Sequence, residues 1–241
     1  MLGLPPQVKT CGQKDLNSDG FADWDSETEK FLSRNYGDFI CPTKTFMVPP
    51  VFESKHRRSD ADNGDKTERG FFDLLQKFGE SREQLGEGMF IVHSYNFKEM
   101  ISDWNEKQTK PEMKWVLGEH DFVLLHPVKG IVFFQVKASC TTKEKFSEAN
   151  KQIDKDMQSV RAFAAANLPK AMQKKVNKML HCRPGFVVMP NCPRPNSQQM
   201  PSNGIFKEDC ETVESFANWW NWKSNGMVKI DQGLFKCLVM W

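Results

Sequence analysis

The feature that most constrains the fold is the stretch 118–139, in which two apolar runs flank a short turn. Residues Asp121–Leu125 and Ile131–Val136 have the length and the β-branched and aromatic content of buried strands. A three-residue loop, 128–130, would place Gly130 in the left-handed conformation that such hairpins favour. The sequence therefore predicts a buried β-hairpin.

Three polar side chains interrupt this apolar hairpin. In the predicted register Asp121 lies opposite Lys137, with Gln135 as a diagonal neighbour. Side chains alternate along a strand, so Gln135 and Lys137 share one face. Buried polar groups are costly unless they meet a partner or a ligand. A carboxylate, an amide oxygen and an ammonium on one face are typical of a site that cuts phosphodiester bonds with the help of a metal.

The hairpin also carries a family resemblance. The pattern resembles the D…(E/Q)-x-K signature of the PD-(D/E)XK nuclease superfamily: Asp121 is followed, after thirteen residues, by Gln135-Val136-Lys137. Within it, the stretch is most similar to the NERD branch (nuclease-related domain), whose hairpin reads D-h-h-h…G-h-h-h-h-E-h-K, where h is apolar. Gln135 stands where most members have Glu, and the Q-x-K form is similar to that of Mrr-like restriction nucleases. The resemblance covers about residues 67–222.

The resemblance implies an α/β fold with a restriction endonuclease-like core, a mixed central β-sheet flanked by helices. It implies hydrolysis of phosphodiester bonds in nucleic acid, with DNA favoured over RNA. Asp121 and Gln135 would hold Mg²⁺, for which Mn²⁺ can substitute, and Lys137 would orient water or stabilise the developing charge. Oxygen ligands without a Cys/His cluster favour Mg²⁺ over Zn²⁺. The alternative, because Gln135 replaces a carboxylate, is a catalytically silent nucleic-acid-binding or scaffolding module.

Glu68 is a further candidate ligand at the start of a helix. Apolar residues at 71, 74, 75 and 78 have helical spacing, and Thr67 is a plausible N-cap. Glu68 would then lie in the first turn, where the helix dipole favours a carboxylate. The resemblance adds a second interpretation, that Glu68 faces the metal.

Two auxiliary residues flank the motif. Strand alternation puts Glu119 on the same side as Asp121, as a reserve ligand, and turns His120 away. Gln152 lies near the start of a long amphipathic helix, in the stretch Asn150-Lys151-Gln152. This stretch is similar to the N-P-x-x-Q stretch of NERD-like proteins, without its Pro and with shorter spacing. Gln152 either reaches the site or is an ordinary surface residue. The core-facing stripe of this helix comprises Phe146, Ala149, Ile153, Met157, Val160 and Ala164.

Nucleic-acid binding must rest on a local surface, because the net charge of the 241-residue chain is only +2. The best local candidate for phosphate contacts is a group of lysines after the long helix, namely Lys170, Lys174, Lys175 and Lys178.

Composition divides the chain into an irregular N-terminal extension or linker, residues 1–66, and a nuclease-like domain, residues 67–241. Further expected elements are a strand at 89–95, a short helix and then a loop at 97–114, a strand at 185–189 and an aromatic-rich helix around 213–220. The apolar end, 234–241, is either a terminal strand or a sign that this is the front part of a longer protein, with a further domain or partner beyond it.

Seven cysteines without a C-x-x-C pair, and no N-x-S/T sequon, fit a reducing compartment. No apolar run approaches transmembrane length, and no signal-peptide pattern is present. The expected location is intracellular, in cytoplasm or nucleus, neither secreted nor in a membrane.

Overall fold

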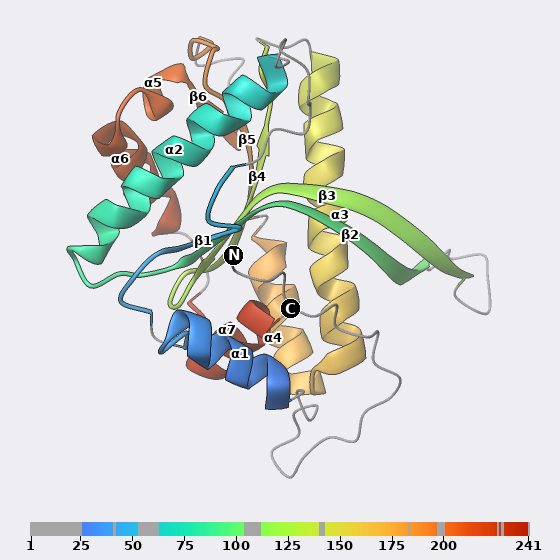
Figure 1. The fold of residues 1–241 in the computed structure, drawn as a ribbon. Coiled ribbons are helices and arrows are strands. Elements are labelled where there is room, and N and C mark those ends of the chain that lie inside the picture. The colour runs from blue at the N-terminus through green and yellow to red at the C-terminus, as the bar shows by residue number, and fades with distance from the viewer. Residues whose placement is uncertain are drawn as a thin grey trace.

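The computed structural model describes residues 26–40, 42–52, 63–103, 112–139, 143–182, 184–196, 201–225, 227 and 229–240. Within them, a six-stranded sheet separates two layers of helices (Figure 1). This confirms the α/β prediction of a mixed central sheet flanked by helices. No described helix combines the length and the apolar character needed to cross a bilayer.

The described elements follow in chain order. The helices are α1 (Ser26–Tyr36), α2 (Asn63–Glu83), α3 (Lys143–Asn167), α4 (Lys170–His181), α5 (Lys207–Cys210), α6 (Val213–Ser224) and α7 (Gln232–Met240). The strands are β1 (Phe46–Val48), β2 (Phe90–Asp103), β3 (Glu112–His126), β4 (Gly130–Val136), β5 (Gly185–Met189) and β6 (Gly204–Phe206).

The strands lie in the sheet in their sequence order, β1 to β6. β2, β3 and β4 form an antiparallel meander, to which β1 adds in parallel at one side. β5 and β6 add in parallel to β4 at the other side. A parallel neighbour needs a crossover, and α3 with α4 provides it between β4 and β5.

Each face of the sheet has its own apolar core. One face carries α1, α3, α4 and α7, with Val160, Leu180 and Phe235 among its fully buried residues. The other carries α2, α5 and α6, where Phe71 of α2 and Trp220 of α6 are almost fully buried. The predicted stripe of α3 is confirmed, since its members from Ala149 to Ala164 are buried and Phe146 packs against them.

The central hairpin exists, but its register differs from the prediction. His126 pairs with Gly130, so the turn consists of residues 127–129. Gly130 has the positive φ expected of it, +85°, at the first position of β4. Moving the loop by one residue shifts the register by two. The last pair is Phe122↔Phe134, and the same register puts Asp121 level with Gln135 instead of Lys137.

The helix and loop predicted at 97–114 are wrong in the described part. β2 runs on to Asp103 and pairs with β3 down to Asp103↔Glu112, while residues 104–111 lie outside the described residues. The two strands extend past the rest of the sheet as a curved ribbon (Figure 1). Cross-strand pairing thus overrides the weak helical spacing that the sequence shows here.

Residues 1–66 are not wholly an irregular extension. Helix α1 and strand β1 lie within them, and α2 begins at Asn63. The rings of Tyr36, Phe46 and Phe90 pack together at centroid distances of 5.1 to 5.3 Å, which ties α1 and β1 to β2. Strand β1, with three residues, is too short to show an alternating pattern in the sequence.

The strand predicted at 234–241 is also wrong. Residues Gln232–Met240 form the helix α7, with Leu234, Phe235 and Leu238 buried against the sheet. A short apolar run does not distinguish a strand from a buried helix.

Candidate functional site

The carboxyl end of β4 carries the predicted motif. Beyond the last β3–β4 pair, the Val136 N–H donates to Oδ2 of Asp121 at 2.8 Å. The next N–H, of Lys137, donates to the Val188 carbonyl of β5 at 2.8 Å. The half-buried Asp121 carboxylate therefore replaces a strand partner at the point where β3 leaves β4. Asp121 is fixed against the backbone between Gln135 and Lys137.

Gln135 points into the core between the sheet and α3. Its side chain is 1% exposed, and its Nε2 donates to Oδ2 of Asp156 on α3 at 3.1 Å. Asp156 is equally buried. Because a carboxylate only accepts, this bond sets which end of the Gln135 amide is nitrogen and turns the amide oxygen away from Asp156.

His120 joins the same buried group, against the prediction that it faces away. Its Nδ1 lies 3.0 Å from Oδ1 of Asp156, and its ring lies 5.9 Å from that of Phe133. Strict alternation fails in β3 at this place, where Ser94 of β2, at φ +51°, interrupts the β2–β3 ladder between His93↔Phe122 and Tyr95↔His120. Asp156 thus accepts a hydrogen bond from Gln135 on one oxygen and lies within ion-pair distance of His120 on the other.

Asp156 is not among the predicted site residues, although its place in the sequence indicates a buried carboxylate. Asp156 lies directly before Met157 and three positions after Ile153, within the core-facing side of α3. A carboxylate at such a position needs polar partners from the sheet. Gln152 lies one turn earlier, and its Nε2 donates to Oδ1 of Asp156 at 3.4 Å. Gln152 therefore approaches the group around Asp156.

The first turns of α2 reach the same end of the sheet from the opposite face. Nδ2 of Asn191 donates to the Ala138 carbonyl at 3.0 Å and to Oγ1 of Thr67 at 3.3 Å. Thr67 is not the N-cap, because it lies inside α2 and donates to the Asn63 carbonyl at 2.7 Å. Glu68, half-buried, follows Thr67 at this end of the sheet.

A cavity of about 430 Å³ lies beside the motif. It is enclosed by the first turns of α2 and by the segments that follow β4 and β5; Lys66, Thr67, Ala138 and Asn191 are among its lining residues. Lys137, half-buried, immediately precedes Ala138. Asp121, Gln135 and Lys137 are not among its described lining residues, and Gln135 points to the opposite face of the sheet, so the cavity adjoins the motif at Ala138.

Other predicted residues are not brought to this end. The side chain of Glu119 lies outside those described. Lys170, Lys174 and Lys175 are on α4, which begins beyond the far end of α3, and that end lies roughly 16 Å along the helix from Asp156. Lys175 also forms an ion pair with Asp231. The lysine group is therefore separate from Asp121, Gln135 and Lys137.

The end of β4 carries two oxygen donors of the kind that bind a hard cation. In the described part of the chain, no three His, Cys, Asp or Glu side chains gather as a metal site. The residues that fit are Asp121, with a carboxylate held at the motif, and Gln135, with an oriented amide oxygen. Mg²⁺ is commonly bound through one or two carboxylates together with substrate phosphates, so a sparse protein ligand set suits it.

Comparison with known proteins gives no match, neither to a family model, nor to a curated protein, nor to a solved structure.

Proposed function

We propose that this chain is a metal-dependent nuclease that hydrolyses phosphodiester bonds, with DNA as the favoured substrate. The observation that carries the proposal is the bond between the Asp121 carboxylate and the Val136 N–H, which joins both halves of the D…Q-x-K pattern. The order α2, β2, β3, β4, α3, β5 is also that expected of a restriction endonuclease-like core. The resemblance to the NERD branch supports the same assignment.

The roles of the motif residues follow from their positions. Asp121 provides the carboxylate and Gln135 a neutral oxygen for Mg²⁺ or Mn²⁺. When bound, such an ion polarises the phosphate and lowers the pKa of an attacking water. Lys137, beside the 430 Å³ cavity, orients that water or stabilises negative charge on the phosphate. Glu68 is an additional ligand from α2.

Asp156 acts in this proposal as a positioning residue. Its Oδ2 accepts a hydrogen bond from Nε2 of Gln135 at 3.1 Å, which turns the amide oxygen of Gln135 away from Asp156. His120, 3.0 Å from the other carboxylate oxygen, holds Asp156 in place.

One observation favours the rival function, a silent nucleic-acid-binding or scaffolding module. Gln135 is 1% exposed and bonded to a buried carboxylate, which is what a purely structural glutamine would show. The two functions differ in whether Asp121, Gln135 and Lys137 catalyse phosphodiester hydrolysis.

Cleavage assays separate them. Plasmid, linear and single-stranded DNA and RNA are incubated with Mg²⁺, Mn²⁺ or EDTA. We expect cleavage with either ion and none with EDTA. Asp121→Asn keeps an oxygen that can accept the Val136 N–H, so the fold persists, and we expect cleavage to fall at least about 100-fold. Lys137→Met should have a similar effect.

Asp73→Asn and Lys77→Met are matched controls, because both side chains are exposed on α2. They should cut at the wild-type rate. A wild type that binds nucleic acid but cuts no substrate under any of these conditions would establish the silent module instead. Undiminished cleavage by Asp121→Asn would remove this carboxylate from the mechanism.

A further inference from the structure

A second and larger cavity lies at the other end of the sheet. Its volume is about 710 Å³, and it opens where β4, β5 and β6 begin, between α3 and the end of α6. Ile131 of β4 lines it, five residues and roughly 16 Å along the strand from Val136, which binds Asp121. Cavities of this size commonly hold small ligands. This one does not include the residues of the proposed nuclease site.

Two lysine side chains line this cavity. Nζ of Lys129 donates to Oγ of Ser224 at 2.6 Å, and Nζ of Lys223 donates to the Ser202 carbonyl at 2.7 Å. Neither ammonium has a carboxylate within ion-pair distance among the described residues. Burial lowers the pKa of both lysines, so an anion at this place would relieve the cost of their partial desolvation. The acidic residue among the lining side chains is the exposed Asp154.

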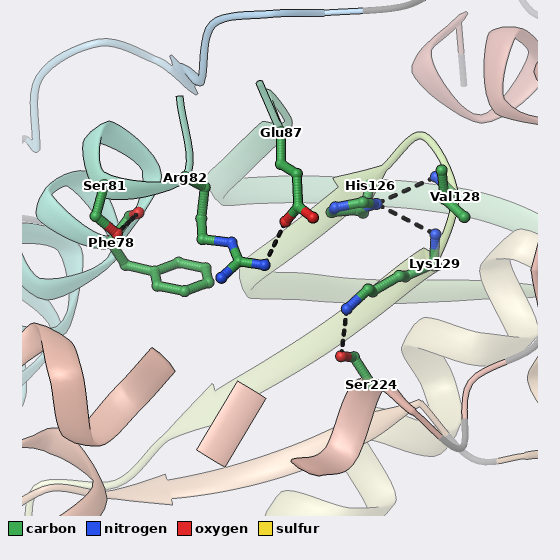
Figure 2. A network of polar contacts seen from close by, with 8 residues as sticks. All are labelled: Phe78, Ser81, Arg82, Glu87, His126, Val128, Lys129 and Ser224. Atoms are coloured by element: carbon green, nitrogen blue, oxygen red, sulfur yellow. Dashed lines mark hydrogen bonds and ion pairs between the residues drawn. The ribbon is translucent and has the colours of Figure 1, made fainter. Parts of the chain in front are cut away.

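The position of Lys129 is fixed by its own turn (Figure 2). Nδ1 of His126 accepts the N–H groups of Val128 and Lys129, at 3.1 and 3.2 Å. The ammonium of Lys129 also lies 5.5 Å from the centre of the Trp220 ring. Lys223 is held in the same way, 4.2 Å from the centre of the Trp222 ring. Both cations are thus pre-positioned at the cavity, and the carboxylates that act on them, Glu87 on Lys129 and Asp209 on Lys223, do so from beyond ion-pair distance.

The rest of the lining is apolar, with two side-chain amides. Ile153, Met157 and Met179, core residues of α3 and α4 that are at most 3% exposed, form its apolar wall. Asn203 donates to Oδ1 of Asn150 at 2.7 Å, so this amide pair stands at the wall between β6 and α3. Apolar surface suits the face of a ring, amides suit the polar edge of a base, and ammonium groups suit phosphate.

We propose that this cavity binds a nucleoside monophosphate, with the phosphate on Lys129 and Lys223 and the base against Ile153 and Met157. The site does not depend on the nuclease function. It would make the chain responsive to free nucleotides at a place separate from the end of β4.

Isothermal titration of the full chain in EDTA tests this binding with AMP, GMP, CMP and UMP as probes. We expect at least one to bind, with a Kd below about 1 mM. Lys129→Met and Lys223→Met should each weaken that binding at least about tenfold. Lys77→Met, on the exposed side of α2, should leave it unchanged. The corresponding nucleoside, without phosphate, should bind at least about tenfold more weakly.

Asp121→Asn distinguishes this site from the proposed nuclease site and should bind the nucleotide as the wild type does. Loss of binding in that variant, with binding retained in both lysine variants, would place the nucleotide at the end of β4 and overturn the proposal. Absence of binding by all four nucleotides to the folded wild type would overturn it as well. Inorganic phosphate that binds as tightly as the nucleotide would overturn the role given to the apolar wall.

Discussion

At the scale of single residues, the Asp156 carboxylate determines what position 135 can be. It lies 3.1 Å from the Gln135 amide nitrogen, and both side chains are 1% exposed. A glutamate at 135 would bring a second carboxylate to a buried one, and like charges at that distance strongly disfavour double ionisation. A neighbour on α3 thus disfavours a Glu at position 135.

Gln135→Glu should therefore lower the free energy of unfolding at pH 7, by about 2 kcal/mol. The exchanged pair Gln135→Glu with Asp156→Asn restores one amide and one carboxylate, and should recover most of the stability. Urea denaturation of the three proteins measures this. Equal stability of Gln135→Glu and wild type would show that the two side chains do not depend on each other.

At the scale of elements, the β3–β4 turn depends on a neutral histidine. Burial, assisted by the Lys129 ammonium, lowers the pKa of His126 to about 4. In the unfolded chain the pKa is near its ordinary value of 6.5, so the unfolded state takes up the proton first. The stability contributed by the neutral ring is complete above pH 6.5 and is lost as the pH falls towards 4, by up to about 3 kcal/mol.

His126→Asn keeps an oxygen acceptor for the turn but has no group that titrates in this range. Urea denaturation at pH 7 and at pH 4 measures the free energy of unfolding. Between these two pH values the variant should lose about 3 kcal/mol less of it than the wild type does. Parallel pH profiles for the two proteins would mean that His126 binds a proton as readily in the folded protein as in the unfolded chain.

At the scale of the whole molecule, the folded unit begins before residue 67. Leu32 and Phe39 are buried in the core that also contains Phe90, and β1 covers the side of β2. A chain that starts at Asn63 would expose this apolar surface and the hydrogen-bonding groups of β2. We expect it to melt at a lower temperature than a chain that starts at Ser26, by several degrees for each 1 kcal/mol lost. Equal melting temperatures would show that residues 26–48 do not contribute to the stability of the folded unit.

The sequence predicted the elements whose pattern is long and regular. The apolar stripe of α3 has regular helical spacing, and the strands of the hairpin are runs of apolar residues. The α/β class follows from the order of these elements. It could not predict the register, because a one-residue choice of loop around Pro127 and Gly130 decides it. Nor could it place His120 or Asp156, since their meeting depends on a local irregularity at Ser94 in a neighbouring strand.

The outermost strands have a consequence for self-association. β1 and β6 are each only three residues long, which offers little length for another chain to add to. In β6 the outward backbone groups are also occupied: the Gly204 N–H donates to the Pro201 carbonyl at 3.1 Å, and the Phe206 N–H donates to Asp209 at 3.0 Å. A six-stranded sheet built largely of Phe, Val and Ile would template cross-strand aggregation if its borders were long and open. Here β1 and β6 are each too short to serve as a seed, although this protection does not reach the ribbon of β2 and β3 that extends past them.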